Sequence, residues 1–181
     1  MGALERQPPA GVDWAEVATA YGLAPTSTGA QTFAAQLAGA ELMIRAGANV
    51  VTIQSTSWDH HGEWPTTRDR MNSEIMPSLS TFLTRARAMQ GFNVVTALTG
   101  EFARTGGAEG HDSGHANGLS ATVVGKRVRQ GTTGRPRVSA QGSYSLPPGT
   151  PATQEFWGFL SSLVSSATQP FGPNAHPSLL A

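Results

Sequence analysis

The chain contains no cysteine, so disulfide bonds, thiolate metal sites and cysteine nucleophiles are all excluded. Any metal ion would have to be bound by His, carboxylate or carbonyl groups. Charged residues are also scarce, at 13%, and 12 basic and 12 acidic side chains balance to a net charge of zero. This balance argues against a nucleic-acid partner and against an anionic membrane surface.

Long apolar runs are missing as well. No stretch approaches the roughly 20 apolar residues that span a bilayer. Residues 1–9 hold no apolar run typical of a signal peptide. As written, the chain is expected to stay out of membranes and in the cytoplasm. Its 181 residues are enough for one domain with a substantial core.

The pattern along the chain predicts three parts. Residues 1–28 are expected to form a loose segment with one short helix after an N-cap at Asp13, residues 29–168 an α/β domain, and residues 169–181 an irregular tail. Within the domain, apolar side chains at helical spacing predict helices over 30–46, over about 75–88 after a polar loop at 55–70, and over 151–166. In the second of these, Pro77 suits the first turn.

Three β-rich runs, at 49–54, 92–98 and 119–125, predict buried strands between these helices. Strand–helix–strand units favour a parallel or mostly parallel sheet flanked by helices. Ligands bind such sheets where loops leave the carboxyl ends of the strands. The loops 55–64 and 100–117, which are rich in ionisable groups, are therefore expected to face one cleft.

The first of these loops contains WDHHGE at residues 58–63. If the backbone is extended there, Asp59 and His61 point to one side and His60 to the other. A carboxylate and an imidazole so placed can bind a divalent cation. The same residues are also common in turns, which is the plainer interpretation of the motif.

The second loop contains HDSGH at residues 111–115, where Asp112 and His115 could approach one ion. Glu101 and Arg104 follow the second predicted strand, and an Arg there could hold an anionic substrate in bidentate fashion. Those two residues could equally pair with each other as a structural bridge. Four of the five His lie in these two loops, which favours the functional interpretation; the fifth, His176, is expected to be solvated.

Taken in order, five motifs resemble the C-terminal half of a bacterial family, the "domain of unknown function 1501", whose fold is similar to the alkaline phosphatase and sulfatase superfamily. The resemblance covers roughly residues 30–165. It rests on AGANVVTI at 46–53, WDHHG at 58–62, MPSLS at 76–80, VVTALTGEFART at 94–105 and GHDS at 110–113.

This resemblance implies an alkaline-phosphatase-like half domain in which Asp59 and His61 bind one divalent ion and Asp112 helps to bind another. Ser113 stands where the family usually has His, and His111 or His115 could substitute for it. Ala103 and Ser80 also depart from the family pattern. The superfamily's other half supplies the hydroxyl nucleophile and, commonly, an export signal; with about 30 residues before the first matching helix, the chain is expected to lack it.

The leading hypothesis is an incomplete metal-dependent hydrolase of phosphate or sulfate esters. Asp59, His61, Asp112 and His115 would hold the metal, Arg104 would bind the anion and Glu101 would orient Arg104. Zn²⁺, Mn²⁺, Fe, Mg²⁺ and Ca²⁺ all remain open.

Two alternatives come from the same residues. One is a non-catalytic assembly module that forms a homodimer or docks to a separate N-terminal half through an open sheet edge. The other is an unrelated single-metal enzyme built on His60 and His61.

Overall fold

The computed structural model describes residues 13–26, 32–56, 58, 64–100, 103–104, 115–116, 120–134, 137–138, 144–145, 153–164 and 170–181. The chain divides into two compact units, Met1–Ala88 and Met89–Ala181. This division differs from the predicted boundaries at 28/29 and 168/169. In the described part of the chain, no helix is long and apolar enough to cross a membrane.

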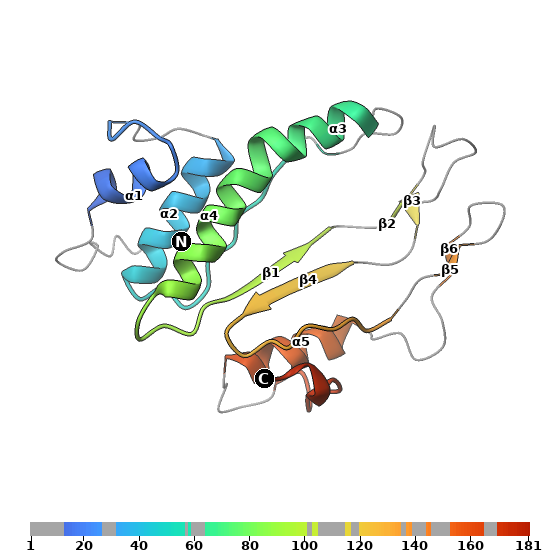
Figure 1. The fold of residues 1–181 in the computed structure, drawn as a ribbon. Helices are drawn as coiled ribbons and strands as arrows, with labels where there is room; N and C mark the ends of the chain where they lie inside the picture. Colours follow the sequence, from blue (N-terminus) through green and yellow to red (C-terminus); the bar gives the residue numbers. More distant parts are fainter. Residues whose placement is uncertain are drawn as a thin grey trace, which may run out of the picture. The chain divides into compact units, whose positions relative to one another are not determined.

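The first unit is built from helices (Figure 1). Helix α1 spans Trp14–Ala20 and α2 spans Phe33–Arg45. A third helical run is continuous from Trp64 to Ala88 and consists of α3 (Trp64–Arg70), the π-helix η1 (Met71–Ile75) and α4 (Met76–Ala88). The expected cap of α1 is confirmed, because the Asp13 side chain accepts from Ala15 N over 2.9 Å.

The core of the first unit lies among α1, α2 and α4. Its buried apolar side chains follow the helical spacing seen in the sequence, with Phe82 rather than Leu83 turned inward. They are Val17, Ala18, Tyr21, Ala35, Leu37, Ala38, Ala40, Ile75, Leu79, Phe82 and Ala86. The predicted inward stripe of the third helical run is therefore confirmed.

The start of that helical run was predicted wrongly. The sequence indicated a loop to about Arg70, yet helix begins at Trp64 and continues through Pro77. A proline inside a helix has no N–H to donate and crowds the carbonyl four residues earlier, here that of Ser73. Ser73 lies in the π-helix, where Met76 N bonds to Met71 O, five residues back. The wider π-helical turn thus precedes Pro77 at the point where a regular α-helical turn would bring the Ser73 carbonyl against the proline ring.

Residues 49–54 were predicted to form a strand, and they do not. Burial alternates along 51–56, half-buried at odd positions and exposed at even ones, which is typical of an extended segment. However, no strand pairs with it among the described residues, and Val50 is 84% exposed. The β-branched composition therefore indicated extended backbone but not a sheet.

The second unit contains antiparallel strand pairs. The predicted strands at 92–98 and 119–125 are found as β1 (Val95–Thr99) and β4 (Ala121–Gly125), which pair antiparallel with Val95 opposite Gly125. Between them, β2 (Ala103–Arg104) pairs antiparallel with β3 (His115–Ala116), and further on β5 (Arg137–Val138) pairs with β6 (Tyr144–Ser145).

The antiparallel direction of β1 and β4 corrects the expectation of parallel neighbours. Parallel strands need a crossover connection, usually a helix, whereas antiparallel strands can be joined by a chain that turns back. The connection from β1 to β4 contains the paired strands β2 and β3, so it turns back on itself. The described residues contain no parallel pair, and the wider alkaline-phosphatase-like sheet stays a prediction.

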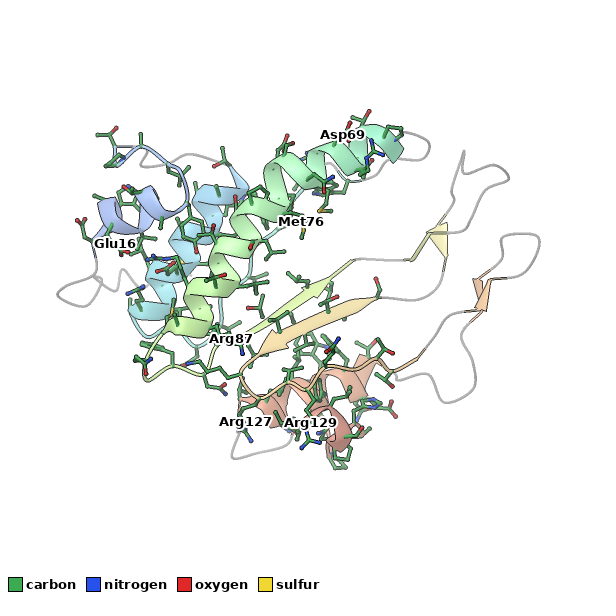
Figure 2. All side chains as sticks on the ribbon, viewed as in Figure 1. Glu16, Asp69, Met76, Arg87, Arg127 and Arg129 are labelled. Carbon is green, nitrogen blue, oxygen red and sulfur yellow. The ribbon has the colours of Figure 1, made fainter. Side chains whose placement is uncertain are left out.

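The end of the chain is more regular than expected. Helix α5 spans Thr153–Leu163 and buries Phe159 and Leu163. The last residues, including the 3-10 helix η3 (Pro177–Leu179), return to the segment after β4: Arg129 N donates to Leu179 O over 2.9 Å and Ala181 N donates to Arg127 O over 2.8 Å. Figure 2 labels Arg127 and Arg129 on this segment, beside α5.

Candidate functional site

Most of the predicted site lies outside the described residues. Asp59, His61, Glu101 and Asp112 are not described, and Arg104 and His115 are described only in their backbone positions. Within the described ranges, no group of three or more His, Asp or Glu side chains could hold a metal ion. The metal set therefore stays a prediction, and the structure bears on it through the segments that lead into these residues.

The chain that enters the first motif is fixed to the helical run of the first unit. Trp58 Nε1 donates to Ser55 Oγ over 2.6 Å, and the guanidinium Cζ of Arg70 lies 4.3 Å from the centroid of the Trp58 ring. Arg70 Nη2 also donates to the carbonyl oxygen of Thr56 over 3.2 Å. Asp59 follows Trp58 directly in the sequence, and Trp58 contacts α3 through Arg70.

The second motif lies in the sequence between the two strands of a short antiparallel pair, β2 and β3. Arg104 stands opposite His115 in the register of this pair, and residues 105–114, which include Asp112, separate the two in the sequence.

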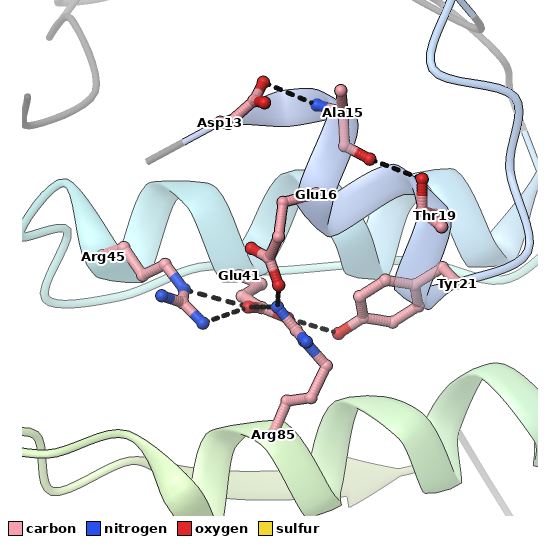
Figure 3. A network of polar contacts seen from close by, with 8 residues as sticks. All are labelled: Asp13, Ala15, Glu16, Thr19, Tyr21, Glu41, Arg45 and Arg85. Atoms are coloured by element: carbon pink, nitrogen blue, oxygen red, sulfur yellow. Dashed lines mark hydrogen bonds and ion pairs between the residues drawn. The ribbon is translucent and has the colours of Figure 1, made fainter. Parts of the chain in front are cut away.

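A polar cluster that the sequence reading missed lies inside the first unit: the Glu41 network, made of Glu16, Tyr21, Glu41, Arg45 and Arg85 (Figure 3). Its centre is the carboxylate of Glu41 on α2, which is 0% exposed. These residues come from α1 and its C-terminal cap, from α2 and from α4. The network therefore joins all three helices that form the core.

Every contact of Glu41 in this network is short. Arg85 donates from Nε to Glu41 Oε2 and from Nη2 to Oε1, both over 2.7 Å, which is the bidentate geometry of strong Arg–carboxylate pairs. Arg45 Nε donates to Oε1 over 2.9 Å and the Tyr21 hydroxyl donates to Oε2 over 3.0 Å. Arg85 Nη2 also reaches Glu16 Oε1 over 2.7 Å. With both oxygens engaged, Glu41 is suited to holding helices together rather than to binding a substrate.

The electrostatics of the network agree with that role. Burial alone would raise the pKa of the Glu41 carboxyl. Hydrogen bonds from Arg85, Arg45 and Tyr21 outweigh burial and hold this pKa below its ordinary value of 4.5. Burial, followed by the charge of Glu41, raises the pKa of Tyr21 above its ordinary value of 10.0. At neutral pH the network thus holds an ionised Glu41 and a protonated Tyr21.

A signal for this network was present in the sequence. Glu41 follows Leu37 by four residues, so it falls on the apolar stripe of α2 where a charge should not be left unpaired. Arg45 follows four residues later again, and Arg85 lies three residues after Phe82 on the inward side of α4. The sequence does not show which cation from another helix meets the buried carboxylate.

His176 also differs from its expectation. It was expected to be solvated, but its side chain is only 18% exposed and its Nε2 lies 3.9 Å from Glu155 Oε2. Its backbone N donates to Asn174 Oδ1 over 2.8 Å. The imidazole is therefore part of the packing of the second unit.

The comparison with protein families gives one match. The family model described as "Protein of unknown function (DUF1501)" matches residues 13–136, which is more than half of the chain. The chain belongs to this family. No curated protein and no solved structure matches it.

The DUF1501 match includes the parts of both units that carry the predicted site. It covers α1 to α4 of the first unit, with the Glu41 network, and continues through β1 to β4 of the second. It ends before α5 and the C-terminal segment. The resemblance suggested by the five motifs is thus confirmed at the level of the family.

Replacing Glu41 by Gln is expected to lower the free energy of unfolding by roughly 3 kcal/mol at neutral pH, because the part-buried guanidinium groups of Arg45 and Arg85 lose the buried carboxylate that balances their charge. Glu16→Gln is the matched control, since Glu16 binds the same Arg85 but is 55% exposed. That change should cost at most about 1 kcal/mol. Urea unfolding followed by circular dichroism measures both; equal losses would contradict a central role for Glu41.

The same network predicts a pH dependence. Because the folded-state pKa of Glu41 is lowered, its contribution to stability is complete above 4.5 and is lost as the pH falls through the folded-state pKa. The difference in unfolding free energy between the wild type and Glu41→Gln should therefore shrink on acidification below that value. A difference that stays constant across this window would show that ionised Glu41 is not its source.

Proposed function

We propose that the chain carries a divalent-metal site for the hydrolysis of phosphate or sulfate esters, in an alkaline-phosphatase-like or sulfatase-like half domain. The proposal keeps the predicted roles: Asp59, His61, Asp112 and His115 would hold the metal, Arg104 would bind the anion and Glu101 would orient Arg104. Membership of the DUF1501 family supports common ancestry with that family, and it assigns no activity to the chain. The chemistry rests on the residues themselves.

The observation that carries the proposal is the pairing of Arg104 with His115. Residues that face each other across an antiparallel pair have Cβ atoms roughly 4.5–5.5 Å apart, close enough for one ligand to contact both. A cationic residue and a potential metal ligand thus occupy neighbouring positions although ten residues separate them in the sequence. A metal-bound ester would need such a neighbour to balance its remaining anionic oxygens.

The donor set fits a divalent ion. Two carboxylates and two imidazoles, without thiolates, suit Zn²⁺ or Mn²⁺, and carboxylates with carbonyl oxygens suit Mg²⁺ or Ca²⁺. When bound, such an ion polarises an ester oxygen and lowers the pKa of an attacking group. Arg104 would hold the anion in place through paired N–H donors. The resemblance assigns the hydroxyl nucleophile to the other half of the superfamily domain, so full turnover would require that half.

Elemental analysis of the purified chain tests this proposal. The wild type should retain stoichiometric divalent metal, and Asp59→Ala/His61→Ala should lose it because two ligands are removed. His60→Ala is the matched control, since His60 is predicted to point to the opposite side and should leave the metal in place. Metal that is lost with His60 but kept without Asp59 would favour the unrelated single-metal site instead. Wild-type protein without metal would refute the proposal.

A second candidate function is assembly with a partner, and the sheet of the second unit favours it. Strands β1 and β4 pair only with each other in the described part of the chain, so each has one outer edge without a strand partner. Two-stranded sheets are marginal alone, and open edges are sites for added strands. A second copy of the chain, or a separate N-terminal half, could add a strand there.

Sedimentation velocity tests this second candidate on the chain alone. A reversible dimer is expected, and Val124→Lys on β4 should weaken it because charged side chains, Lys above all, oppose edge pairing. Val50→Lys is the control, since Val50 is exposed but lies outside the sheet. A wild type that stays monomeric at the highest attainable concentration would count against self-assembly and leave only a separate partner.

A further inference from the structure

The second unit contains a short antiparallel contact that the proposed function does not use. One side is residues 127–131, which lie shortly after β4 and which we call the docking edge; the other is residues 176–181, the C-terminal segment. Val128 stands opposite Leu180 in an antiparallel bridge. Two backbone hydrogen bonds flank this pair, one from Arg129 N to Leu179 O over 2.9 Å and one from Ala181 N to Arg127 O over 2.8 Å. This is the pattern of an antiparallel ladder around a pair that is not itself hydrogen-bonded.

One side chain of the C-terminal segment meets the docking edge at a residue that has no side chain. A Cβ atom at Gly131 would lie only 2.8 Å from Leu179 Cδ2, so the leucine occupies the space that a side chain there would fill. Gly131 does not have a positive φ, so its backbone conformation does not itself require glycine. The space beside Gly131 therefore accommodates Leu179 and is not needed for a turn.

The C-terminal segment is already shaped for this contact by its own backbone. The 3-10 helix η3 ends at Leu179, and Leu180 follows with φ −85° and ψ 139°, which is an extended conformation. Leu180 N also donates to Pro177 O over 3.1 Å. The residue opposite Val128 is thus held extended by the turn before it, so less conformational entropy is lost when the segment pairs.

Contacts of this kind recognise a segment mainly through its backbone. When an extended peptide adds to an open strand, main-chain hydrogen bonds give affinity and a space for a side chain gives selectivity. The docking edge offers one carbonyl, Arg127 O, one donor, Arg129 N, and the space beside Gly131. The occupant that fits it is an extended segment with a leucine at the position of Leu179.

A second copy of the chain carries such a segment. Contacts made within one chain can also be made between two identical chains, which is the basis of dimers formed by exchange. Within one chain, the attached segment has an effective concentration that is roughly millimolar, so it fills the docking edge first. A docking edge that loses its own segment is then open to the segment of another chain.

We propose that the docking edge is an interaction surface for the C-terminal segment of a second copy, closed in each chain by that chain's own segment. This inference goes beyond the proposed function, because it uses neither the metal ligands nor the outer edges of β1 and β4. The DUF1501 match contains the docking edge and ends before the segment that fills it. The surface thus lies in the family part of the chain and its occupant outside that part.

Two single variants of the full chain separate the surface from its occupant. Leu179→Asp keeps the docking edge but disables the segment, because a carboxylate replaces the apolar contact with Gly131. Gly131→Val keeps the segment but fills the space that Leu179 needs. A mixture of the two variants supplies one open edge and one intact segment, whereas each variant alone lacks one of them.

The backbone amide resonance of Arg129 reports on the docking edge, since this N–H bonds to the segment. In isotopically labelled Leu179→Asp it should leave its wild-type position. It should move more than halfway back when unlabelled Gly131→Val is added to a concentration that is roughly millimolar. A synthetic peptide with the sequence of residues 171–181 should have the same effect. Unchanged resonances of β1 and β4 establish that the second unit remains folded; if they change, Leu179→Ala, which adds no charge, takes the place of Leu179→Asp.

Matched controls accompany each addition. Ser178→Asp introduces the same charge at an exposed neighbouring residue and should leave the Arg129 resonance in its wild-type position. The double variant Gly131→Val/Leu179→Asp has neither an open edge nor an intact segment, so adding it should not restore the resonance. A peptide with aspartate in place of the leucine at the position of Leu179 should not restore it either.

Each outcome decides the inference. Restoration of the Arg129 resonance by Gly131→Val and by the intact peptide, with no effect of the controls, supports it. A resonance that does not move in Leu179→Asp shows that the segment is not held at the docking edge and overturns the inference. Restoration by the peptide but not by Gly131→Val overturns the second copy as the partner. Equal effects of the intact and altered peptides overturn recognition of the leucine, and the inference with it.

Discussion

A carboxylate withdrawn from water must find its countercharge within the protein, and in the first unit this requirement determines how three helices meet. Glu41 is fully buried on α2, and its partners come from the end of α1, from α2 itself and from α4. Apolar packing among Val17, Leu37 and Phe82 allows many slightly different arrangements of similar helices. The bidentate contact with Arg85 allows few, so it fixes the rotation of α4 against α2.

That constraint extends to the chain near the predicted metal pair. Helix α4 continues backward without interruption through the π-helix into α3, so fixing α4 also fixes the direction of α3 and of Arg70. Arg70 in turn holds Trp58, the residue that precedes Asp59. The buried ion pair of Glu41 and the half-buried Trp58 are therefore linked by one continuous helical run. In the second unit, the antiparallel pairing of β2 with β3 places Arg104 opposite His115.

The sequence predicted what depends on neighbouring residues. The Asp13 cap, the stripe of Leu79, Phe82 and Ala86, and the strands near 95–99 and 121–125 are all local patterns, and the structure contains them. Features that depend on distant partners were missed. Pro77 indicated a helix start because the π-helix before it could not be foreseen, and the antiparallel direction of β1 and β4 depends on how residues 100–120 turn back. Of the site, the motifs could be read, but the sequence did not show that Arg70 lies over Trp58 or that Arg85 meets Glu41.

The most direct test of the account is to locate the metal in crystals of the zinc-loaded chain, using anomalous scattering at the zinc absorption edge. We expect a peak within roughly 2.0–2.2 Å of the Asp59 carboxylate and the His61 imidazole. A peak elsewhere, such as beside Glu155 and His176, or no peak at all, would contradict the central claim that Asp59 and His61 bind a metal ion.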